Sequence, residues 1–160
     1  MNGNVDFEGE WMNNHGVTES ERDDLKNNLI VPMSIEEFVI GDVILNDKNI
    51  TTLHFSPLLI RLKRIEIGNK CFKYVREFVI DGLESLESVI IGEDCFRIGR
   101  EERDDGICRI ANCPNLRQLE IGDESFRYFK SFELSNVKSL QSIKFGICCF
   151  QYADVSLKGE

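Results

Sequence analysis

Six cysteines and two histidines are the residues of this 160-residue chain with the widest chemical range, because they can bind metals, form disulfides or act as nucleophiles. A zinc site would need a Cys-x-x-Cys spacing or histidines close to the cysteines. No Cys-x-x-Cys occurs, and His15 and His54 lie far from any cluster of cysteines. The sequence therefore predicts no metal site.

The cysteines are also poor candidates for disulfides, because the first residues lack the basic and apolar regions of a signal peptide. We interpret them as small buried apolar residues, a common role of free cysteine. Cys148, which stands beside Cys149, is the candidate for an exposed, redox-sensitive thiol.

Acidic side chains are abundant, and paired carboxylates could catalyse hydrolysis. Glu66, Glu120 and Glu133 alternate with apolar residues, however, which predicts that they point outward from strands and keep the surface hydrated. His54 alternates with apolar neighbours in the same way. No glycine-rich phosphate loop or nucleophile elbow occurs. We therefore predict that the chain is not an enzyme and has no catalytic or cofactor-binding residues.

The net charge of −9 also limits the partners. A surface that binds nucleic acid or an anionic membrane needs a concentrated positive field. No apolar run approaches the length of a membrane span. We expect a cytoplasmic protein whose partner is neither nucleic acid nor membrane.

A short pattern that recurs down the chain indicates how these residues are positioned. Ile-Gly-x-x-Cys-Phe occurs, with Ser for Cys or Phe for Ile in single copies, at residues 67–72, 91–96, 121–126 and 145–150. Its glycines are 24, 30 and 24 residues apart. A fixed period in this range is the signature of a solenoid. The six extra residues of the longer interval fall in the charged stretch 100–106, which we expect to form a surface loop.

Each repeat reads as two short strands joined by tight turns. Residues 78–80 and 89–91 alternate apolar and other side chains, which is typical of strands with one face inward. Between them, leucines spaced by three suit a tight turn. We expect Gly92 to follow the second strand because glycine adopts a positive φ without cost. One coil buries too little apolar surface to offset its backbone entropy, so the coils must stack.

The leucine spacing at 83–91 (Leu-x-x-Leu-x-x-Val-x-Ile) and 116–121 (Leu-x-x-Leu-x-Ile) resembles the core of a leucine-rich repeat. The Ile-Gly-x-x-Cys-Phe ending is similar to the Ile-Gly-x-x-Ala-Phe ending of the irregular, BspA-like leucine-rich repeats. The resemblance covers residues 34–157. It implies an α/β-type curved solenoid with short parallel strands on one side, coils of about 24 residues, and a role in protein recognition or adhesion.

The chain departs from the usual leucine-rich pattern where an inward Asn or Cys is normally stacked. Lys70, Asp94, Glu124 and Cys148 occupy that position, and charged side chains would not stack inside. We expect the small residue one step later to turn inward instead; these residues are Cys71, Cys95, Ser125 and Cys149. A parallel β-helix, whose coils have similar lengths, is the alternative fold.

The sequence divides into two regions. Residues 1–33 carry seven acidic and two basic side chains and are expected to be flexible, with a cap over the first coil at 25–33. Residues 34–160 form the solenoid, whose last coil begins at Val155 and is incomplete. Because no polar cap follows it, we expect either a fragment of a longer array or self-association through this C-terminal coil.

Outward residues of the second strand in each repeat, with the residues that flank them, form the candidate partner-binding strip. Ile90 is its apolar candidate anchor, although it also fits an ordinary isolated surface residue. The strip comprises Arg64, Glu66, Ser88, Ile90, Gln118, Glu120, Ser142 and Lys144.

Three functions are compatible with these features. We favour a non-enzymatic protein-protein interaction module, a leucine-rich repeat scaffold that binds an unidentified protein or peptide. One alternative is a regulatory or targeting segment of a larger, possibly enzymatic, polypeptide. The other is an adhesion-type repeat protein.

Overall fold

The computed structural model describes residues 31–102 and 105–159, and in this part every coil contributes one strand to each of two sheets. Sheet A consists of β1 (Glu37–Ile40), β3 (Arg64–Ile67), β5 (Ser88–Ile91), β7 (Gln118–Ile121) and β9 (Ser142–Phe145). Sheet B consists of β2 (Thr52–Phe55), β4 (Glu77–Asp81), β6 (Ile107–Ala111), β8 (Ser131–Ser135) and β10 (Asp154–Lys158).

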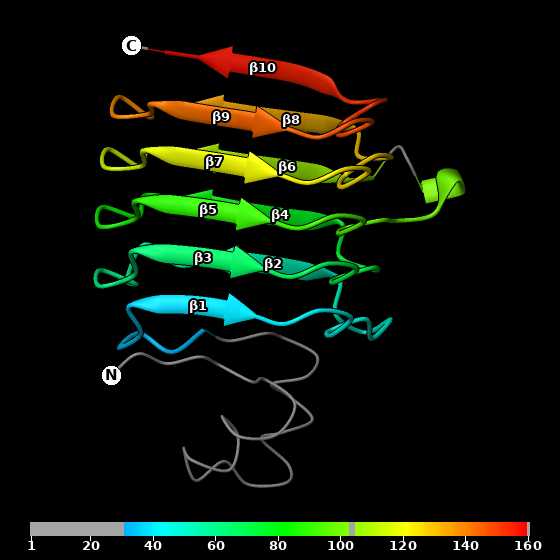
Figure 1. Cartoon of the computed structure of the whole chain (residues 1–160), viewed down its shortest axis with the longest axis horizontal. Helices are drawn as coiled ribbons and strands as arrows, with labels where there is room; N and C mark the ends of the chain where they lie inside the picture. The colour runs from blue at the N-terminus through cyan, green and yellow to red at the C-terminus, as the bar shows by residue number, and fades with distance from the viewer. Residues whose placement is uncertain (1–30, 103–104, 160) are drawn as a thin grey trace, which may run out of the picture.

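All neighbouring strands in both sheets are parallel and pair between successive coils. Arg64 pairs with Ser88, 24 residues later, and Gln118 pairs with Ser142 across the same interval. Figure 1 shows the strands of sheet A stacked one above another, with sheet B behind them. The predictions of a solenoid, of short parallel strands and of coils of about 24 residues are confirmed.

The described residues contain almost no helix. A 3₁₀ helix, η1 (Arg100–Glu102), lies in the charged insertion, and this described part of the insertion projects from the stack, as expected of a surface loop (Figure 1). The α/β character and the one-sided sheet that the resemblance implied are not found, because the return half of each described coil is a strand that pairs in sheet B. The two-sheeted coil is that of a parallel β-solenoid, the alternative fold.

Alternation along the strands builds the core. In β3, Ile65 and Ile67 are buried between the sheets, while Arg64 and Glu66 point outward. The turns add a second buried layer, because the phenylalanines that end the repeat pattern stack coil upon coil. Ring centroids lie 5.2 Å apart for Phe72–Phe96, 4.4 Å for Phe96–Phe126 and 4.9 Å for Phe126–Phe150. Neighbouring coils therefore share one continuous apolar interior.

The small residue before each of these phenylalanines does turn inward, as predicted. The Cys71 and Cys95 thiols and the Ser125 hydroxyl are buried, and the Cys149 thiol is half-buried. Each lies within hydrogen-bonding distance of the carbonyl oxygen of the repeat glycine one coil earlier, at 3.1, 2.9, 2.7 and 2.8 Å in that order. The four side chains form a Cys/Ser ladder along the axis of the solenoid.

The six cysteines are all free, which agrees with a structural role. Burial raises the pKa of Cys113 to about 11 and that of Cys108 well above its usual value, so these thiols stay protonated at neutral pH. Burial also raises the pKa of Cys149. Cys148 is partly exposed, in line with its expected position outside the core.

The expectation that the repeat glycines adopt a positive φ is wrong. The residues with positive φ are the non-glycines two and four positions later, such as Asp94 at 59° and Phe96 at 53°. This conformation aims the Asp94 N–H at the carbonyl of Asp123 in the next coil, at 2.8 Å. Gly92 is needed for a different reason: a Cβ there would lie 2.8 Å from the backbone carbon of Gly68.

The predicted flexible segment lies mostly outside the described residues, as does the proposed cap apart from its last residues. Val31 and Ile35 are buried in the core, and β1 begins at Glu37. Val155 and Leu157, which were expected to begin an incomplete coil, lie in β10 and pair with β8. Within the described ranges, no helix is long and apolar enough to span a membrane.

Candidate functional site

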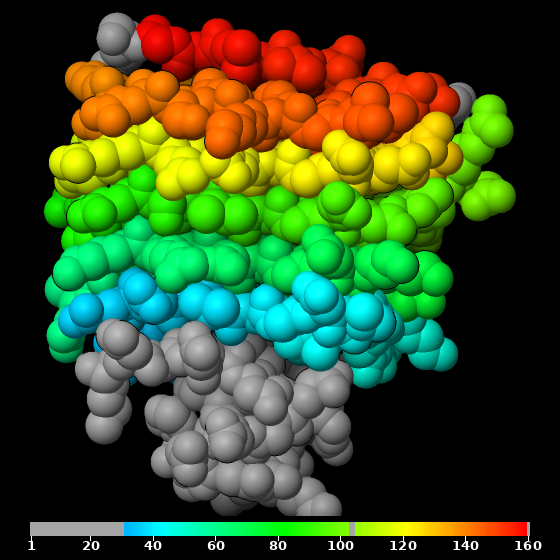
Figure 2. All heavy atoms as spheres, in the orientation of Figure 1, coloured from blue at the N-terminus to red at the C-terminus, as the bar shows by residue number. Residues whose placement is uncertain are grey.

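The candidate partner-binding strip lies on the outward face of sheet A, where strand register brings all eight residues together. One row runs from Arg64 through Ser88 and Gln118 to Ser142, and a second from Glu66 through Ile90 and Glu120 to Lys144. Figure 2 shows this face as level bands, one for each coil. Because consecutive positions on a strand alternate between faces, the residue between the two rows in each strand points into the core.

The strip is a packed surface rather than a set of free side chains. Seven of its eight residues are half-buried, and Lys144, on the last strand of the sheet, is exposed. Strands in a sheet lie about 4.8 Å apart, so each outward side chain is flanked by those of its neighbours.

Charges on the strip are paired within it. The Arg64 guanidinium contacts the Glu66 carboxylate and also lies 3.9 Å from a carboxylate oxygen of Glu37. At the other end, Gln118 donates a 2.8 Å hydrogen bond to Glu120, and the Lys144 ammonium lies 3.2 Å from the same carboxylate oxygen. The hydrogen bond from Gln118, followed by the contacts with Lys144, lowers the pKa of the Glu120 carboxyl. Glu120 is therefore ionised at neutral pH, and both glutamates are held in place by their partners.

Ile90 lies between these two charged groups. Its neighbours across the sheet are Glu66 on β3 and Glu120 on β7. Each glutamate is held by a partner on the side away from Ile90 or on its own strand. The arrangement leaves an apolar contact point flanked by two carboxylates, which suits an apolar side chain of a partner with hydrogen-bond donors on either side.

The outward face of sheet B also carries paired side chains, but its apolar Val79 lies between His54 and Arg109 instead of between two carboxylates. Arg109 lies 3.2 Å from Asp81 and 3.6 Å from Glu133, and His54 lies 3.0 Å from Glu77. His54 is exposed, as predicted. This face offers a natural internal control for the strip.

Two hollows were not anticipated from the sequence. One, of about 320 Å³, lies beside the turns that follow sheet A and is lined by Val43, Asn46, Lys70, Lys73, Asp94 and Arg97. The other, of about 230 Å³, opens at the C-terminal coil. The sequence feature that could have indicated the first hollow is the recurrence of basic residues at one turn position. The feature that could have indicated the second hollow is the apolar alternation of β10.

The part of the chain that the structure describes contains no group of three or more His, Cys, Asp or Glu side chains arranged to hold a metal ion.

Comparison of the chain with protein-family models, with curated proteins and with solved structures gave no significant match in any of the three. The geometry of the two sheets and the surfaces that they present are therefore the basis for inferring a function.

Proposed function

We propose that this protein is a non-enzymatic protein-interaction module that binds a protein or peptide through the candidate partner-binding strip. The observation that carries the proposal is the position of Ile90 between Glu66 and Glu120 on a parallel sheet. Apolar side chains at the centre of a packed patch dominate many interfaces. Because paired side chains already hold the carboxylates, binding would order few additional groups.

The chemistry of the strip limits the partner. An apolar side chain would contact Ile90, while Lys, Arg or amide groups on either side would bind Glu66 and Glu120. Charge pairs of this kind add specificity and speed of association more than affinity. The partner is therefore a segment with a hydrophobic residue between basic or hydrogen-bonding ones.

We also infer that the repeats are related to the irregular, BspA-like leucine-rich repeats. Leu83, Leu86 and Val89 point inward with no exposed surface, as the apolar core positions of such a repeat would. Members of repeat families commonly use their sheet faces for binding, so this relationship supports the same function.

The test begins with proximity labelling by the full-length chain in its native cell, followed by affinity measurements on each purified candidate. Ile90→Lys and the double change Glu66→Lys with Glu120→Lys should weaken binding roughly tenfold or more. The matched control is Val79→Lys, at a half-buried outward position on β4 of sheet B, which should leave affinity unchanged. Circular dichroism verifies that the variants remain folded. If folded Ile90→Lys and Val79→Lys proteins bind every partner equally well, the strip is not the binding surface.

A further inference from the structure

In the C-terminal coil, the side chains at the inward strand positions are exposed. The side chains at the equivalent positions of the earlier described coils are buried. Ile143 and Phe145 on β9 are 48% and 44% exposed, and Val155 and Leu157 on β10 are 55% and 65% exposed. Their equivalents one coil earlier are at most 4% exposed; these are Leu119, Ile121, Phe132 and Leu134. The four exposed residues define the C-terminal face.

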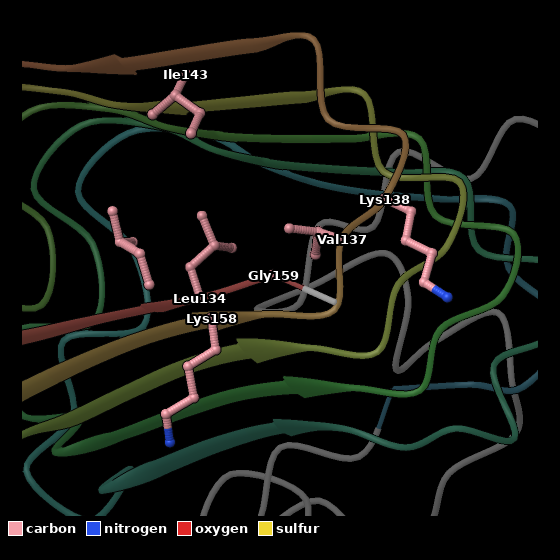
Figure 3. A pocket seen from close by; sticks show the side chains of 7 residues that line it. Leu134, Val137, Lys138, Ile143, Lys158 and Gly159 are labelled. Atoms are coloured by element: carbon pink, nitrogen blue, oxygen red, sulfur yellow. The ribbon is translucent and has the colours of Figure 1, made fainter.

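A hollow of about 230 Å³ opens in this face between the two sheets. Figure 3 shows Ile143 from one sheet and Leu134 from the other pointing toward the space between them. Lys138 and Lys158 stand at its margin, with their ammonium groups directed away from it (Figure 3). The interior of the hollow is therefore apolar, and it is not shielded by charge.

The strands that border the hollow are also unpaired on one side. Among the described strands, β9 and β10 are each the last of their sheet and have one neighbour, β7 and β8 respectively. Free strand edges recruit other strands unless charged side chains, proline or a bulge blocks them. Both strands carry outward charges, Lys144 on β9 and Asp154 and Lys158 on β10, but no inward one. The inward positions here are Ile, Phe, Val and Leu, and neither strand contains proline.

A surface that binds the C-terminal face must present two strand edges that are as far apart as β9 and β10, with apolar side chains between them. The first coil of this chain does not, because Phe38, Ile40, Leu53 and Phe55 are at most 2% exposed. A second C-terminal face has the required geometry by identity. We propose that two copies of this chain associate through their C-terminal faces about a two-fold axis.

A two-fold axis could pair β9 with β9 of the second copy, or β9 with β10. The charge of Lys144 favours the second arrangement. If β9 paired with β9 of the second copy, the outward Lys144 side chains would meet across the junction, and directly opposed like charges are destabilising. In Figure 1, β9 and β10 run in opposite directions. A two-fold axis parallel to the strands therefore places β9 antiparallel to β10 of the second copy. We propose the register that sets the inward residues of the two strands against one another, in which Lys144 lies opposite Ser156, and Ile143 and Phe145 lie opposite Leu157 and Val155.

The proposed junction continues both sheets and buries the hollow from each side. The junction is limited to one coil, so it falls at the low end of the size range for specific interfaces, and we expect a weak dimer that dissociates in the micromolar range. The dimer should form and dissociate across experimentally accessible concentrations.

Sedimentation velocity of the full-length chain from about 1 to 200 µM tests the association, since that range brackets the expected constant. The wild type should shift from monomer to dimer, and Leu157→Lys should remain monomeric across the range. The matched control is Leu58→Lys, because Leu58 is 64% exposed and lies far from the face, in the turn after β2. This variant should dimerise like the wild type. A wild-type monomer throughout, equal behaviour of the two variants, or species larger than a dimer would overturn the proposal.

Cysteine cross-linking tests the pairing of strands. Under mild oxidation, the double variant Lys144→Cys with Ser156→Cys should form an intermolecular disulfide that Lys144→Cys alone does not form. The wild type, with its own Cys148 and Cys149, gives the background on the same non-reducing gel. Efficient cross-linking of Lys144→Cys alone would show that β9 pairs with itself, against the arrangement proposed.

Discussion

At the scale of single residues, the Cys/Ser ladder shows how one side-chain position joins successive coils. The Ser125 hydroxyl donates to the Gly92 carbonyl at 2.7 Å and accepts from the Cys95 N–H at 3.0 Å. The hydrogen bond with the Cys95 N–H is buried and that with the Gly92 carbonyl is partly buried, so water has little access to replace a lost partner. Ser125 therefore satisfies two backbone groups of the preceding coil at once.

We predict that Ser125→Ala lowers the free energy of unfolding by about 1–3 kcal/mol, the usual cost of leaving a buried polar group unpaired. Ser125→Cys introduces the residue that the neighbouring coils have at this position, so it should lower the free energy of unfolding by less. Urea denaturation of the three proteins gives the comparison. Equal stability of the Ala variant and the wild type would mean that the ladder contributes no net stabilisation.

At the scale of the element, the turn after each sheet A strand is set by the closeness of neighbouring coils. The repeat glycine accepts a contact that no side chain would allow: at Gly122, a Cβ would lie 2.5 Å from the backbone carbon of Gly92 and 2.7 Å from the nitrogen of Glu93. In the first coil, a Cβ at the equivalent Gly41 would meet no atom within 4 Å. The same sequence position is therefore under steric constraint only where a coil precedes it.

Gly122→Ala should destabilise the protein by about 1–3 kcal/mol or more, because the added methyl group must push two coils apart. Gly41→Ala should change stability by a few tenths of a kcal/mol, since neither glycine has a positive φ and the substitution is otherwise the same. Thermal or chemical unfolding of the pair measures the difference. Similar losses in both variants would indicate that backbone conformation, rather than the approach of the coils, requires glycine.

At the scale of the whole molecule, stability should decline toward the open end. Each described coil pairs only with the coils next to it, so an internal coil has two interfaces and the last described coil has one. The amide of Gly92 donates to Ile67 at 2.8 Å and that of Gly146 to Ile121 at the same distance. These two hydrogen bonds are locally equivalent and differ in their position along the stack.

Native-state hydrogen exchange followed by NMR should therefore show faster exchange at Gly146 than at Gly92, by roughly tenfold or more. The measurement should be made at a low micromolar protein concentration, where association through the C-terminal face is minimal. Uniform protection along the chain would instead indicate that all coils open together as one cooperative unit.

Much of this architecture could be read from the sequence because it depends on local alternation. The 24-residue period, the inward Ile and Phe positions, the inward turn of Cys71, Cys95 and Ser125, and the surface location of the charged insertion all follow from which residues are apolar. The strip could be named for the same reason: once the repeats are aligned, outward positions such as Glu66, Ile90 and Glu120 fall into a row.

Pairing between coils determined the features of the structure that the sequence did not predict. The alternation predicted both short strands of a coil, but their pairing into two separate sheets depends on hydrogen bonds to residues about 24 positions away, which the local pattern does not reveal. The role of the glycines, the ion pair between Lys144 and Glu120, and the open hollow beside Leu157 likewise arise only when coils are stacked. Sequence by itself determined which side chains face inward, because burial favours apolar groups; tertiary structure determined how closely the coils approach and which surfaces they leave uncovered.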